Sequence, residues 1–503
     1  MNQSNYLYDS LFRHTNDSKK IFLINQNGEM SYKLFHQLVN QISHTLIDSG
    51  LKKGDRVIVQ AEKSNIQLAL YVATIKSGGV YLPLNTEYTV NEIKYFIDDS
   101  KANIIVIDSK NEESVRNNIK DGSKKILTLN ADETGSLSDL SDKKKKEFDA
   151  IPRKPEDLAA ILYTSGTTGR SKGAQLSHKN LLSNTMVLKD FWNFSENDIL
   201  LHMLPIYHTH GLFVACNLLS YVGGSMIFLP KFDIDEAISW MKRANTMMGV
   251  PTFYTRLLND DRFNKELSNH MRLFISGSAP LLAETHIEFE KRTGKQIIER
   301  YGMTETNMNT SNPYHGPRVA GTVGLPLPGV KLRIVNQDGK EVDKGEIGII
   351  ELKGDNVFGG YWGNPDKTSE SFRQDGYFIT GDMARIGENG YVIIVGRDKD
   401  LIITGGLNVY PKEVENLIDE IDSVEESAVI AVPHSDFGEA VVSVVVKKKK
   451  SIIEQDIKDY LSQRVAKFKQ PKKIIFVNSL PRNTMGKVQK SELRKKYQNL
   501  FKI

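Results

Sequence analysis

A short loop rich in hydroxyl groups and glycine, with one lysine, has the clearest chemistry in the sequence. It covers residues 164–173 and reads Thr-Ser-Gly-Thr-Thr-Gly-Arg-Ser-Lys-Gly. Glycines let backbone N–H groups approach an anion closely, the hydroxyls add donors, and Lys172 adds a positive charge. The loop therefore predicts a polyphosphate site. It differs from the Walker P-loop, which needs Gly-Lys-Ser/Thr, because Ser171 precedes Lys172 and Gly173 follows it.

The same loop also fits the Gly-x-Ser-x-Gly turn of α/β-hydrolases, with Ser171 as nucleophile and His208 or His434 as its base. That turn requires a strand to end directly at its first glycine. Here the hydroxyl- and glycine-rich residues 164–168 separate the preceding apolar run from Gly169. A hydrolase is therefore a remote alternative, which labelling of Ser171 by a serine-directed phosphonate would support.

The elements around the loop belong to an alternation of strands and helices. β-branched runs at residues 56–60 and 103–107 flank an amphipathic stretch at residues 68–77, which is typical of parallel strands joined by helices. An apolar run at residues 158–162 precedes the loop, and a helix can start near residues 176–180. The sequence thus predicts an α/β fold in which a strand, the loop and a helix follow one another.

The pattern of the chain changes towards its C-terminus. Residues 330–395 contain short strands separated by turns such as Asn-Gln-Asp-Gly at residues 336–339, which predicts a mainly β subdomain. About one hundred residues then resume as a small α/β unit. We expect an N-terminal domain over residues 1–398, made of layered α/β subdomains and the β-rich one, and a mobile α/β C-terminal domain over residues 399–503.

Composition narrows the classes of partner. The 66 Lys and Arg residues nearly balance 62 Asp and Glu, which does not favour nucleic acid or an anionic membrane. The single cysteine, Cys216, excludes an internal disulfide and a cysteine-based zinc site. The sequence shows no secretory signal and no apolar stretch of membrane-spanning length. We therefore expect a soluble cytoplasmic protein with small-molecule partners, and the oligomeric state stays open.

Four further motifs follow the loop in a specific order. They are Arg-Tyr-Gly-Met-Thr-Glu at residues 300–305, Tyr-Phe-Ile-Thr-Gly-Asp at 377–382, Gly-Arg-Asp-Lys-Asp at 396–400 and Asn-Thr-Met-Gly-Lys at 483–487. In this order the chain resembles the adenylate-forming enzyme superfamily, which contains the acyl-CoA synthetases, over nearly its full length. Residues 299–310, followed by Ala-Gly-Thr-Val-Gly at 320–324, resemble the malonyl-CoA synthetases.

The resemblance implies a two-step reaction that uses ATP, Mg²⁺ and coenzyme A. The substrate carboxylate attacks the α-phosphate to give an acyl-adenylate and diphosphate, and the CoA thiol then displaces AMP. The implied acid is malonate, with methylmalonate also accepted, because one methyl group changes binding by only about 1–3 kcal/mol. Two alternatives stay open: a CoA ligase for a short- or medium-chain fatty or aryl acid, and an adenylation domain that loads a carrier protein.

The resemblance also implies roles for single residues. Lys487, Lys172 and Glu305 are the expected catalytic residues, and Lys487 is the adenylation lysine. Glu305 and Thr164 are the expected Mg²⁺ ligands, since hard oxygen ligands suit this ion. Lys399 occupies the hinge between the domains. The remaining expected contacts are, for CoA, Gly405 and Gly406, and, for ATP or AMP, Thr164, Ser165, Gly166, Thr167, Thr168, Gly169, Ser278, Ala279, Pro280, Tyr301, Gly302, Met303, Thr304, Asp382 and Arg397.

The choice of acid is expected to depend on Arg300. If this arginine points inward, its desolvated guanidinium needs an anionic partner, which a second substrate carboxylate supplies through paired N–H···O bonds. The resemblance adds Arg256, His208 and Ser276 as contacts of the acyl substrate. Each arginine has the alternative of a surface position outside the pocket, and His208 that of a structural histidine.

Overall fold

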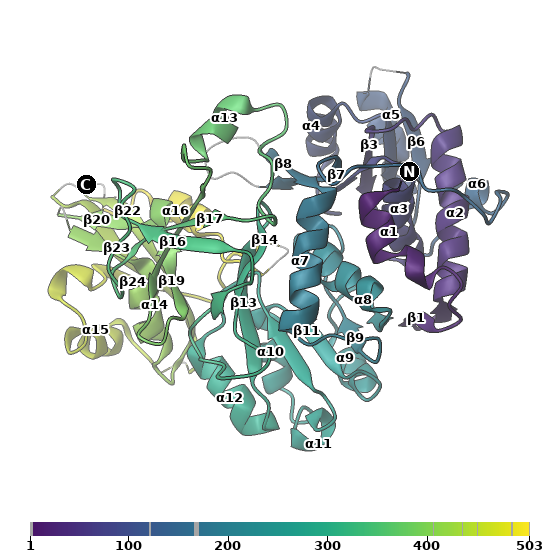
Figure 1. Ribbon diagram of the computed structural model, residues 1–503. Helices are drawn as coiled ribbons and strands as arrows, with labels where there is room; N and C mark the ends of the chain where they lie inside the picture. Colours follow the sequence, from purple (N-terminus) through teal and green to yellow (C-terminus); the bar gives the residue numbers. More distant parts are fainter. Residues whose placement is uncertain are drawn as a thin grey trace.

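The chain has the α/β fold that the sequence predicts (Figure 1). The computed structural model describes residues 4–119, 122–164, 171–405, 407–434, 436–449, 451–483 and 486–501. The expected site residues that lie outside the described residues are Ser165, Gly166, Thr167, Thr168, Gly169 and Gly406. Within the described ranges, no helix has both the length and the apolar composition that a membrane crossing needs.

A six-stranded sheet carries Thr164 and Lys172, which lie near the two ends of the hydroxyl-rich loop. Its strands are β3 (Arg56–Gln60), β4 (Val80–Pro83), β5 (Ile104–Ile107), β6 (Lys125–Thr128), β7 (Leu158–Thr164) and β8 (Lys172–Ser177). Their order is β6-β5-β3-β4-β7-β8, and the pairs are parallel except for β7 and β8. Every residue of β5 is buried, because a parallel sheet covered on both faces requires continuous apolar strands.

A second sheet of nine strands carries Ser276 and the expected site residues 300–303. Its strands are β1 (Ile21–Asn25), β2 (Gly28–Ser31), β9 (Ile199–His202), β10 (Ser225–Phe228), β11 (Thr246–Gly249), β12 (Leu273–Ser276), β13 (Ile297–Met303), β14 (Asn307–Ser311) and β15 (Leu325–Pro326). Their order is β15-β14-β13-β12-β11-β9-β10-β1-β2. The six central strands are parallel, whereas β2, β14 and β15 pair antiparallel at the edges. The carboxyl ends of β12 and β13 therefore lie side by side.

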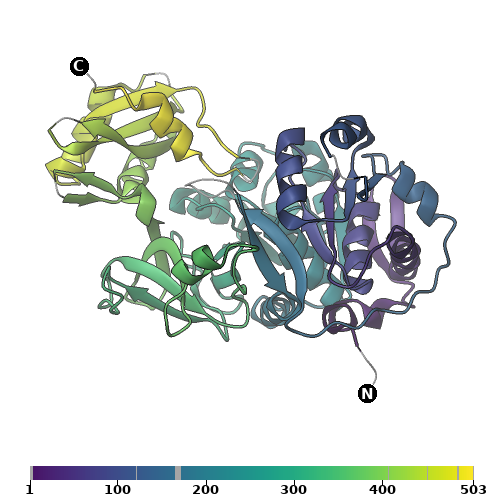
Figure 2. The same cartoon turned by 90° about the horizontal axis from the view of Figure 1, so that it is seen from above.

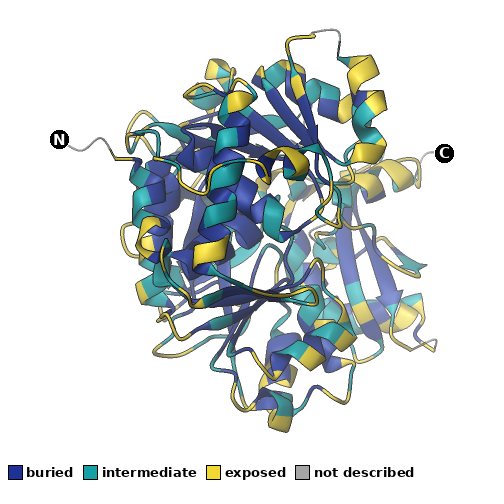
Figure 3. Cartoon of the chain, turned by 90° about the vertical axis from the view of Figure 1, so that its right-hand side faces the viewer, coloured by how far each residue is buried: buried dark blue, intermediate teal, exposed yellow. Residues whose placement is uncertain are grey.

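Helices cover the two sheets and fill the space between them. They are α1 (Tyr6–Leu11), α2 (Tyr32–Asp48), α3 (Asn65–Lys76), α4 (Val90–Ser100), α5 (Glu112–Asn118), α6 (Ser136–Ser141), α7 (His178–Phe191), α8 (Asn217–Val222), α9 (Ile234–Met241), α10 (Pro251–Leu258), α11 (Lys265–Ser268) and α12 (Ala283–Thr293). Residues 67–76 of α3 are all buried, as expected of a core helix. One core cluster joins Val57 of β3, Leu70 of α3 and Leu200 of β9, and buried residues dominate the sheets in Figure 3.

The element that follows the hydroxyl-rich loop differs from the prediction. Strand β8 pairs antiparallel with β7, with Thr164 opposite Lys172, so the loop connects two strands of a hairpin. Helix α7 begins only at His178, where the Ser177 side chain caps it in a reciprocal arrangement with Asn180. The helix start expected near residues 176–180 is therefore confirmed, whereas the sequence did not predict strand β8 between the loop and the helix. Lys172 lies at the start of this strand.

The β-rich subdomain is a four-stranded antiparallel sheet. Its strands, in spatial order, are β16 (Lys331–Val335), β17 (Gly348–Lys353), β18 (Phe378–Ile386) and β19 (Val392–Arg397), and α13 (Pro365–Glu370) lies between β17 and β18 in the sequence. The register places Asp382 opposite Arg397. Two motifs that are separate in the sequence are thus cross-strand neighbours.

The C-terminal part forms a smaller α/β unit that stands apart from the main body (Figure 2). Its elements are β20 (Ile402–Thr404), β21 (Leu407–Val409), α14 (Pro411–Asp419), β22 (Val424–His434), β23 (Gly438–Lys447), α15 (Glu454–Ser462), β24 (Lys473–Val477) and α16 (Lys490–Tyr497). Two core clusters, one around Val429 and one around Ile430, contain only residues beyond 401. Separate cores are typical of a separate domain. The boundary at residue 399 stays a prediction.

Candidate active site

Asp382, which is buried, forms one polar group with the half-buried Arg397 and Tyr301. The Arg397 Nε lies 2.7 Å from Asp382 Oδ1, and the Tyr301 hydroxyl donates to Asp382 Oδ2 at 2.6 Å. The charge of Asp382 raises the pKa of Arg397, and burial raises the pKa of Tyr301 well above its ordinary value. The two carboxylate oxygens thus have different donors, which fixes the orientation of all three side chains.

Glu305 lies in the turn between β13 and β14 and is 6% exposed. The Tyr361 hydroxyl donates to Glu305 Oε1 at 3.0 Å, and burial raises the pKa of the Glu305 carboxyl. Lys172 Nζ lies 5.8 Å from the centre of the same Tyr361 ring. Tyr361 therefore places the expected acidic residue and the expected phosphate-binding lysine near each other.

Arg300 is buried, with 3% of its surface exposed. Among the described residues, its Nε and Nη2 have no hydrogen-bond partner, and burial lowers its pKa to about 9. A Cβ at Gly277 would lie 2.3 Å from Arg300 Cζ, so the guanidinium occupies the space that this glycine leaves. The expectation that Arg300 points inward agrees with this geometry.

Two further polar groups near Arg300 also have no hydrogen-bond partner among the described residues. They are Ser276 Oγ, at the end of β12 beside Gly277, and His210 Nε2. The other ring nitrogen of His210, Nδ1, lies 3.2 Å from Ser278 Oγ. The charge of Arg300 lowers the pKa of His210, after the larger effect of burial. These groups leave unused donors around one buried cation.

His208 lies within the same electrostatic environment. Burial, together with the charges of Lys487 and Arg300, lowers its pKa to about 4. The imidazole is therefore neutral near pH 7. His210 begins a π-helical segment, His210–Cys216, a form of helix that is frequent at functional sites.

The segment that carries Lys487 approaches the large domain from the C-terminal domain, and Lys487 itself is exposed. A Cβ at its neighbour Gly486 would lie 3.4 Å from Thr252 Oγ1 on α10 of the large domain. Desolvation by the surrounding protein lowers the pKa of Lys487. The positive charge of Arg397 also lowers this pKa, whereas the negative charge of Asp382 raises it. In Figure 2 a segment near the C-terminus extends from the small domain towards the main body.

The remaining expected residues line the ends of β12 and β13. Ser278, in the left-handed region with φ 71°, and Ala279 and Pro280 follow β12, whereas Gly302 and Met303 end β13 and Thr304 follows. A Cβ at Gly302 would lie 2.1 Å from the Asn307 carbonyl oxygen. This position therefore tolerates only glycine.

Arg256, Lys399 and Gly405 lie at the edge of this group or outside it. Arg256 is exposed on α10, with its guanidinium carbon 6.0 Å from the centre of the Phe232 ring. Lys399 is exposed in a 3₁₀ turn, Asp398–Asp400, between β19 and β20. Gly405 donates its N–H to the Phe437 carbonyl oxygen at 2.9 Å, within its own domain. The C-terminal domain thus presents Lys487, and not Gly405, to the large domain.

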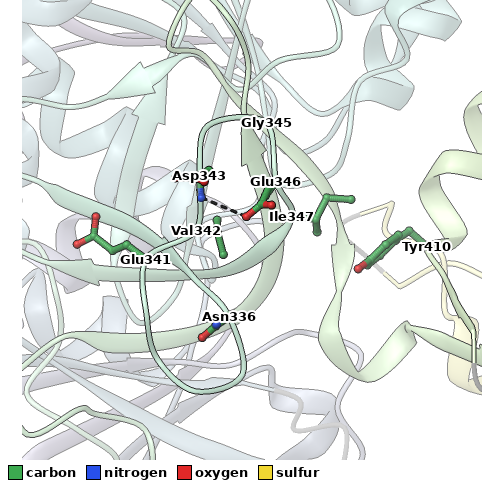
Figure 4. Close-up of a pocket in the computed structure, with 8 residues that line it drawn as sticks. All are labelled: Asn336, Glu341, Val342, Asp343, Gly345, Glu346, Ile347 and Tyr410. Atoms are coloured by element: carbon green, nitrogen blue, oxygen red, sulfur yellow. Dashed lines mark hydrogen bonds between the residues drawn. The ribbon is translucent and has the colours of Figure 1, made fainter.

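A surface pocket lies away from these residues (Figure 4). It is lined by Asn336, Glu341, Val342, Asp343, Gly345, Glu346, Ile347 and Tyr410. It lies beside the β-rich subdomain and the start of α14, and none of the expected site residues lines it. It adds nothing to the chemistry described above.

Comparison with known proteins decides the family. The model of the AMP-binding enzymes matches residues 12–362, and that of the AMP-binding enzyme C-terminal domain matches residues 413–487. The chain belongs to the AMP-binding enzyme family. This membership agrees with the resemblance drawn from the motifs and, with the hairpin of β7 and β8, it removes the hydrolase alternative at Ser171, because β7 ends at Thr164 and a strand follows Ser171.

Within this family, the chain is similar to proteins that act on malonate. A malonate–CoA ligase of Arabidopsis thaliana is 34% identical over 487 residues, which cover 90% of this chain and 79% of that protein. A mitochondrial malonate–CoA ligase of Mus musculus is 32% identical, with coverage of 95% and 88%. The crystal structure of ATP-bound MatB from Rhodopseudomonas palustris is 54% identical, with a TM-score of 0.97 and coverage of 99% and 100%.

The residues also fit a magnesium ion of the kind that the motifs imply. Across the described ranges, no group of three or more His, Cys, Asp or Glu side chains is arranged to hold a metal. Mg²⁺ needs fewer protein ligands, because one or two carboxylates and substrate phosphates suffice. The buried carboxylate of Glu305 suits this mode of binding.

Sequence reasoning missed two residues of this site. Tyr361, which contacts Glu305 and lies near Lys172, follows two glycines in a Phe-Gly-Gly-Tyr-Trp run, and no periodicity distinguishes it from a core aromatic. His210 was not predicted, although it lies only two positions from the predicted His208. Only the tertiary structure shows which ring nitrogen of His210 is unpartnered.

Proposed function

We propose that the protein is an ATP-dependent acyl-CoA ligase that converts malonate to malonyl-CoA through a malonyl-adenylate, releasing AMP and diphosphate. The similarity to malonate–CoA ligases and to ATP-bound MatB supports the reaction class and the nucleotide. The observation that carries the choice of acid is the buried, partly unpartnered guanidinium of Arg300.

The energetics of Arg300 favour a dicarboxylic acid. An uncompensated buried charge costs several kcal/mol, whereas a carboxylate paired with a guanidinium through two hydrogen bonds offsets this cost. A fatty or aryl acid would bring only apolar groups to Arg300 and would leave the cost in place. Ser276 Oγ, which has no partner among the described residues, offers one more donor to the distal carboxylate. Malonate is short enough to use these groups together, and methylmalonate adds one methyl group.

Arg256 is the second candidate for the distal carboxylate. Thr252 and Arg256 are four residues apart on α10, so they share one helix face. Gly486 approaches this face at Thr252. Arg256 is therefore on the side of α10 that the Lys487 segment approaches, although its side chain is exposed. His208, neutral and close to Arg300, is the proposed contact of the reacting carboxylate.

The adenylation step needs positive charge around the transferring phosphorus, because a carboxylate attacks a polyanion there. We assign this role to Lys487 and Lys172, with the loop residues 165–169 as backbone and hydroxyl donors. Glu305, with Thr164 as a second oxygen donor, would hold Mg²⁺, whose charge neutralises the phosphates. Asp382 and Arg397 would hold the ribose hydroxyls. Tyr301 and residues 278–280 would lie against the adenine, and residues 302–304 would line the nucleotide.

The thioester step requires a different part of the C-terminal domain. Gly486, next to Lys487, approaches Thr252 of the large domain, which supports an arrangement suited to adenylation. We propose that rotation at Lys399 replaces the Lys487 segment at the large domain by Gly405 and Gly406. These two glycines then pass close to the pantetheine arm of CoA. The large domain would bind both substrates throughout.

An acid panel tests the proposal. The purified protein is given ATP, Mg²⁺ and CoA with malonate, methylmalonate, acetate, octanoate or benzoate, and diphosphate release is measured together with the thioester product. We expect malonate to give the highest kcat/KM and methylmalonate the second highest. Preference for acetate, octanoate or benzoate would contradict the dicarboxylate assignment. Diphosphate release without a CoA thioester would favour a carrier-protein acceptor.

A further inference from the structure

The segment that carries Lys487 is a tight hairpin on the C-terminal domain. Arg482 and Val488 form an antiparallel bridge, and the Asn483 N–H donates to the Lys487 carbonyl oxygen at 2.9 Å. The Gly486 N–H donates to the Asn483 carbonyl oxygen at 2.8 Å, and Gly486 has φ +72°. These backbone bonds hold the turn together, but they do not connect it to the rest of the domain.

The Arg482 side chain makes such a connection, in addition to the packing of Val488 against the core of the domain. Its Nη1 donates to the Gly486 carbonyl oxygen at 2.5 Å, and its Nη2 forms an ion pair with Glu426 Oε2. Glu426 belongs to the edge strand β22 and lies opposite Val446 of β23, so its backbone is held by the pairing of these two strands. One guanidinium thus connects the carbonyl group next to Lys487 to the sheet.

This connection lies where the two domains meet. Gly486, whose carbonyl group accepts the Arg482 bond, is also the residue that approaches Thr252 of α10. The Lys487 side chain has four rotatable carbon–carbon bonds and is not fixed by an ion pair of its own among the described residues. Its position in the site therefore depends on how firmly the backbone of the hairpin is held.

We propose that Arg482, oriented by Glu426, is a positioning residue that presents Lys487 to the large domain for the adenylation step and has no role in the thioester step. The inference rests on the proposed function, because it takes Lys487 as the adenylation lysine. Arg482 acts through the Gly486 carbonyl group and does not touch substrate. Loss of its charge removes one charge-assisted hydrogen bond and one partly exposed ion pair.

The two half-reactions are measured separately in the full-length protein. Malonate-dependent exchange of diphosphate into ATP reports adenylation, and a rapid-quench chase of enzyme-bound malonyl-adenylate with CoA reports thioester formation. For Arg482→Gln we expect the exchange kcat to fall about tenfold and the CoA step to change less than about twofold. Arg482→Lys, which keeps the charge, should recover part of the exchange rate.

Two further variants make the result specific. Glu426→Gln keeps the Arg482 bond to Gly486 but removes the ion pair, so we expect a smaller fall in exchange, about two- to fivefold. Arg464→Gln is the matched control, because Arg464 lies on the same domain with its guanidinium carbon 3.7 Å from the centre of the Tyr460 ring. This control should change neither half-reaction.

Equal losses in both half-reactions for Arg482→Gln would overturn the inference, as would an unchanged exchange rate. If Arg482→Gln does not fold, as judged by circular dichroism, Glu426→Gln is compared with Arg464→Gln instead. A loss of exchange that exceeds the loss in the CoA step supports the inference, whereas equal losses or an unchanged exchange rate overturn it. Failure of the proposed function looks different, because the unmodified protein would then show no malonate-dependent exchange.

Discussion

At the scale of single residues, Arg300 illustrates how burial can reveal a substrate. Guanidinium groups are rarely buried without partners, because the loss of hydration is costly. The protein accepts this cost at Arg300, where Gly277 leaves the necessary space. A cost that persists in the folded protein is most simply offset by a ligand of opposite charge. This reasoning gives two predictions that separate charge from position.

The first prediction concerns the charge of Arg300. Arg300→Gln should lower kcat/KM for malonate by roughly 30- to 150-fold, because a hydrogen-bonded charge pair contributes about 2–3 kcal/mol. ATP binding, measured by calorimetry without malonate, should change little. Arg256→Gln, at the exposed position on α10, should have a smaller effect. Unchanged malonate kinetics in Arg300→Gln would show that the guanidinium does not face the substrate.

The second prediction concerns the position of the same guanidinium. In Gly277→Ala, the new Cβ would lie 2.3 Å from Arg300 Cζ. The end of a long side chain can move, so we expect the thermal midpoint to change by only a few degrees, whereas malonate kcat/KM should fall roughly ten- to 100-fold. Gly211→Ala provides the contrast, since its Cβ would meet the Pro205 backbone oxygen at 2.1 Å. That variant should lose stability instead.

At the scale of elements, the segment around Tyr361 connects two parts of the site. The backbone N–H of Trp362 donates to the Gly173 carbonyl oxygen on β8 at 2.7 Å, and the backbone N–H of Phe358 donates to the Glu305 carbonyl oxygen at 2.8 Å. Tyr361 between them contacts the Glu305 carboxylate. The segment thus fixes the distance between the strand that begins with Lys172 and the turn that holds Glu305.

Removal of one hydroxyl tests this connection. Tyr361→Phe leaves the Glu305 carboxylate without the donor at 3.0 Å, and groups that orient a metal ligand typically affect metal affinity by about ten- to 100-fold. We expect Mn²⁺, used as a paramagnetic substitute for Mg²⁺, to bind about tenfold more weakly in the presence of ATP, as measured by electron paramagnetic resonance. Tyr391→Phe is the control, because its hydroxyl bonds to the Pro317 carbonyl oxygen. Equal Mn²⁺ affinities in both variants would refute the connection.

The same scale shows what the sequence could and could not predict. The continuous apolar runs of β3 and β5 were recognisable, because strands buried on both faces must be apolar. Strand β8 was missed, since its mixed sequence Lys-Gly-Ala-Gln-Leu-Ser pairs with β7 through backbone contacts that no periodicity reveals. The motif order predicted a set of candidate residues, of which the structure brings Tyr301, Asp382 and Arg397 into contact. It could not predict Tyr361 or His210, whose roles depend on contacts between distant segments.

At the scale of the whole molecule, buried ionisable groups give the fold a dependence on pH. Burial lowers the pKa of His36 to about 3 and that of His178 to about 3. It raises the pKa of Glu299 to about 8 and that of Asp419 to about 7. The histidines favour folding at higher pH, because only the unfolded chain binds their protons in acid. The two carboxyls act in the opposite sense, since the folded chain keeps their protons to a higher pH.

His36 isolates one of these contributions. Its Nε2 lies 2.9 Å from Thr15 Oγ1, its Nδ1 has no partner among the described residues, and it is 3% exposed. Its folded pKa lies below the ordinary value of 6.5, so its stabilising effect is complete above pH 6.5 and is lost as the pH falls towards 3. The slope over this interval is about 1.4 kcal/mol per pH unit.

His36→Gln should therefore make the free energy of unfolding, measured in urea between pH 4 and 6, less steep in pH by about this amount. Because the neutral imidazole is packed in the core, the variant loses stability at pH 7, and this loss should shrink as the pH falls. A loss that is the same at every pH would mean that His36 is not buried in its neutral form.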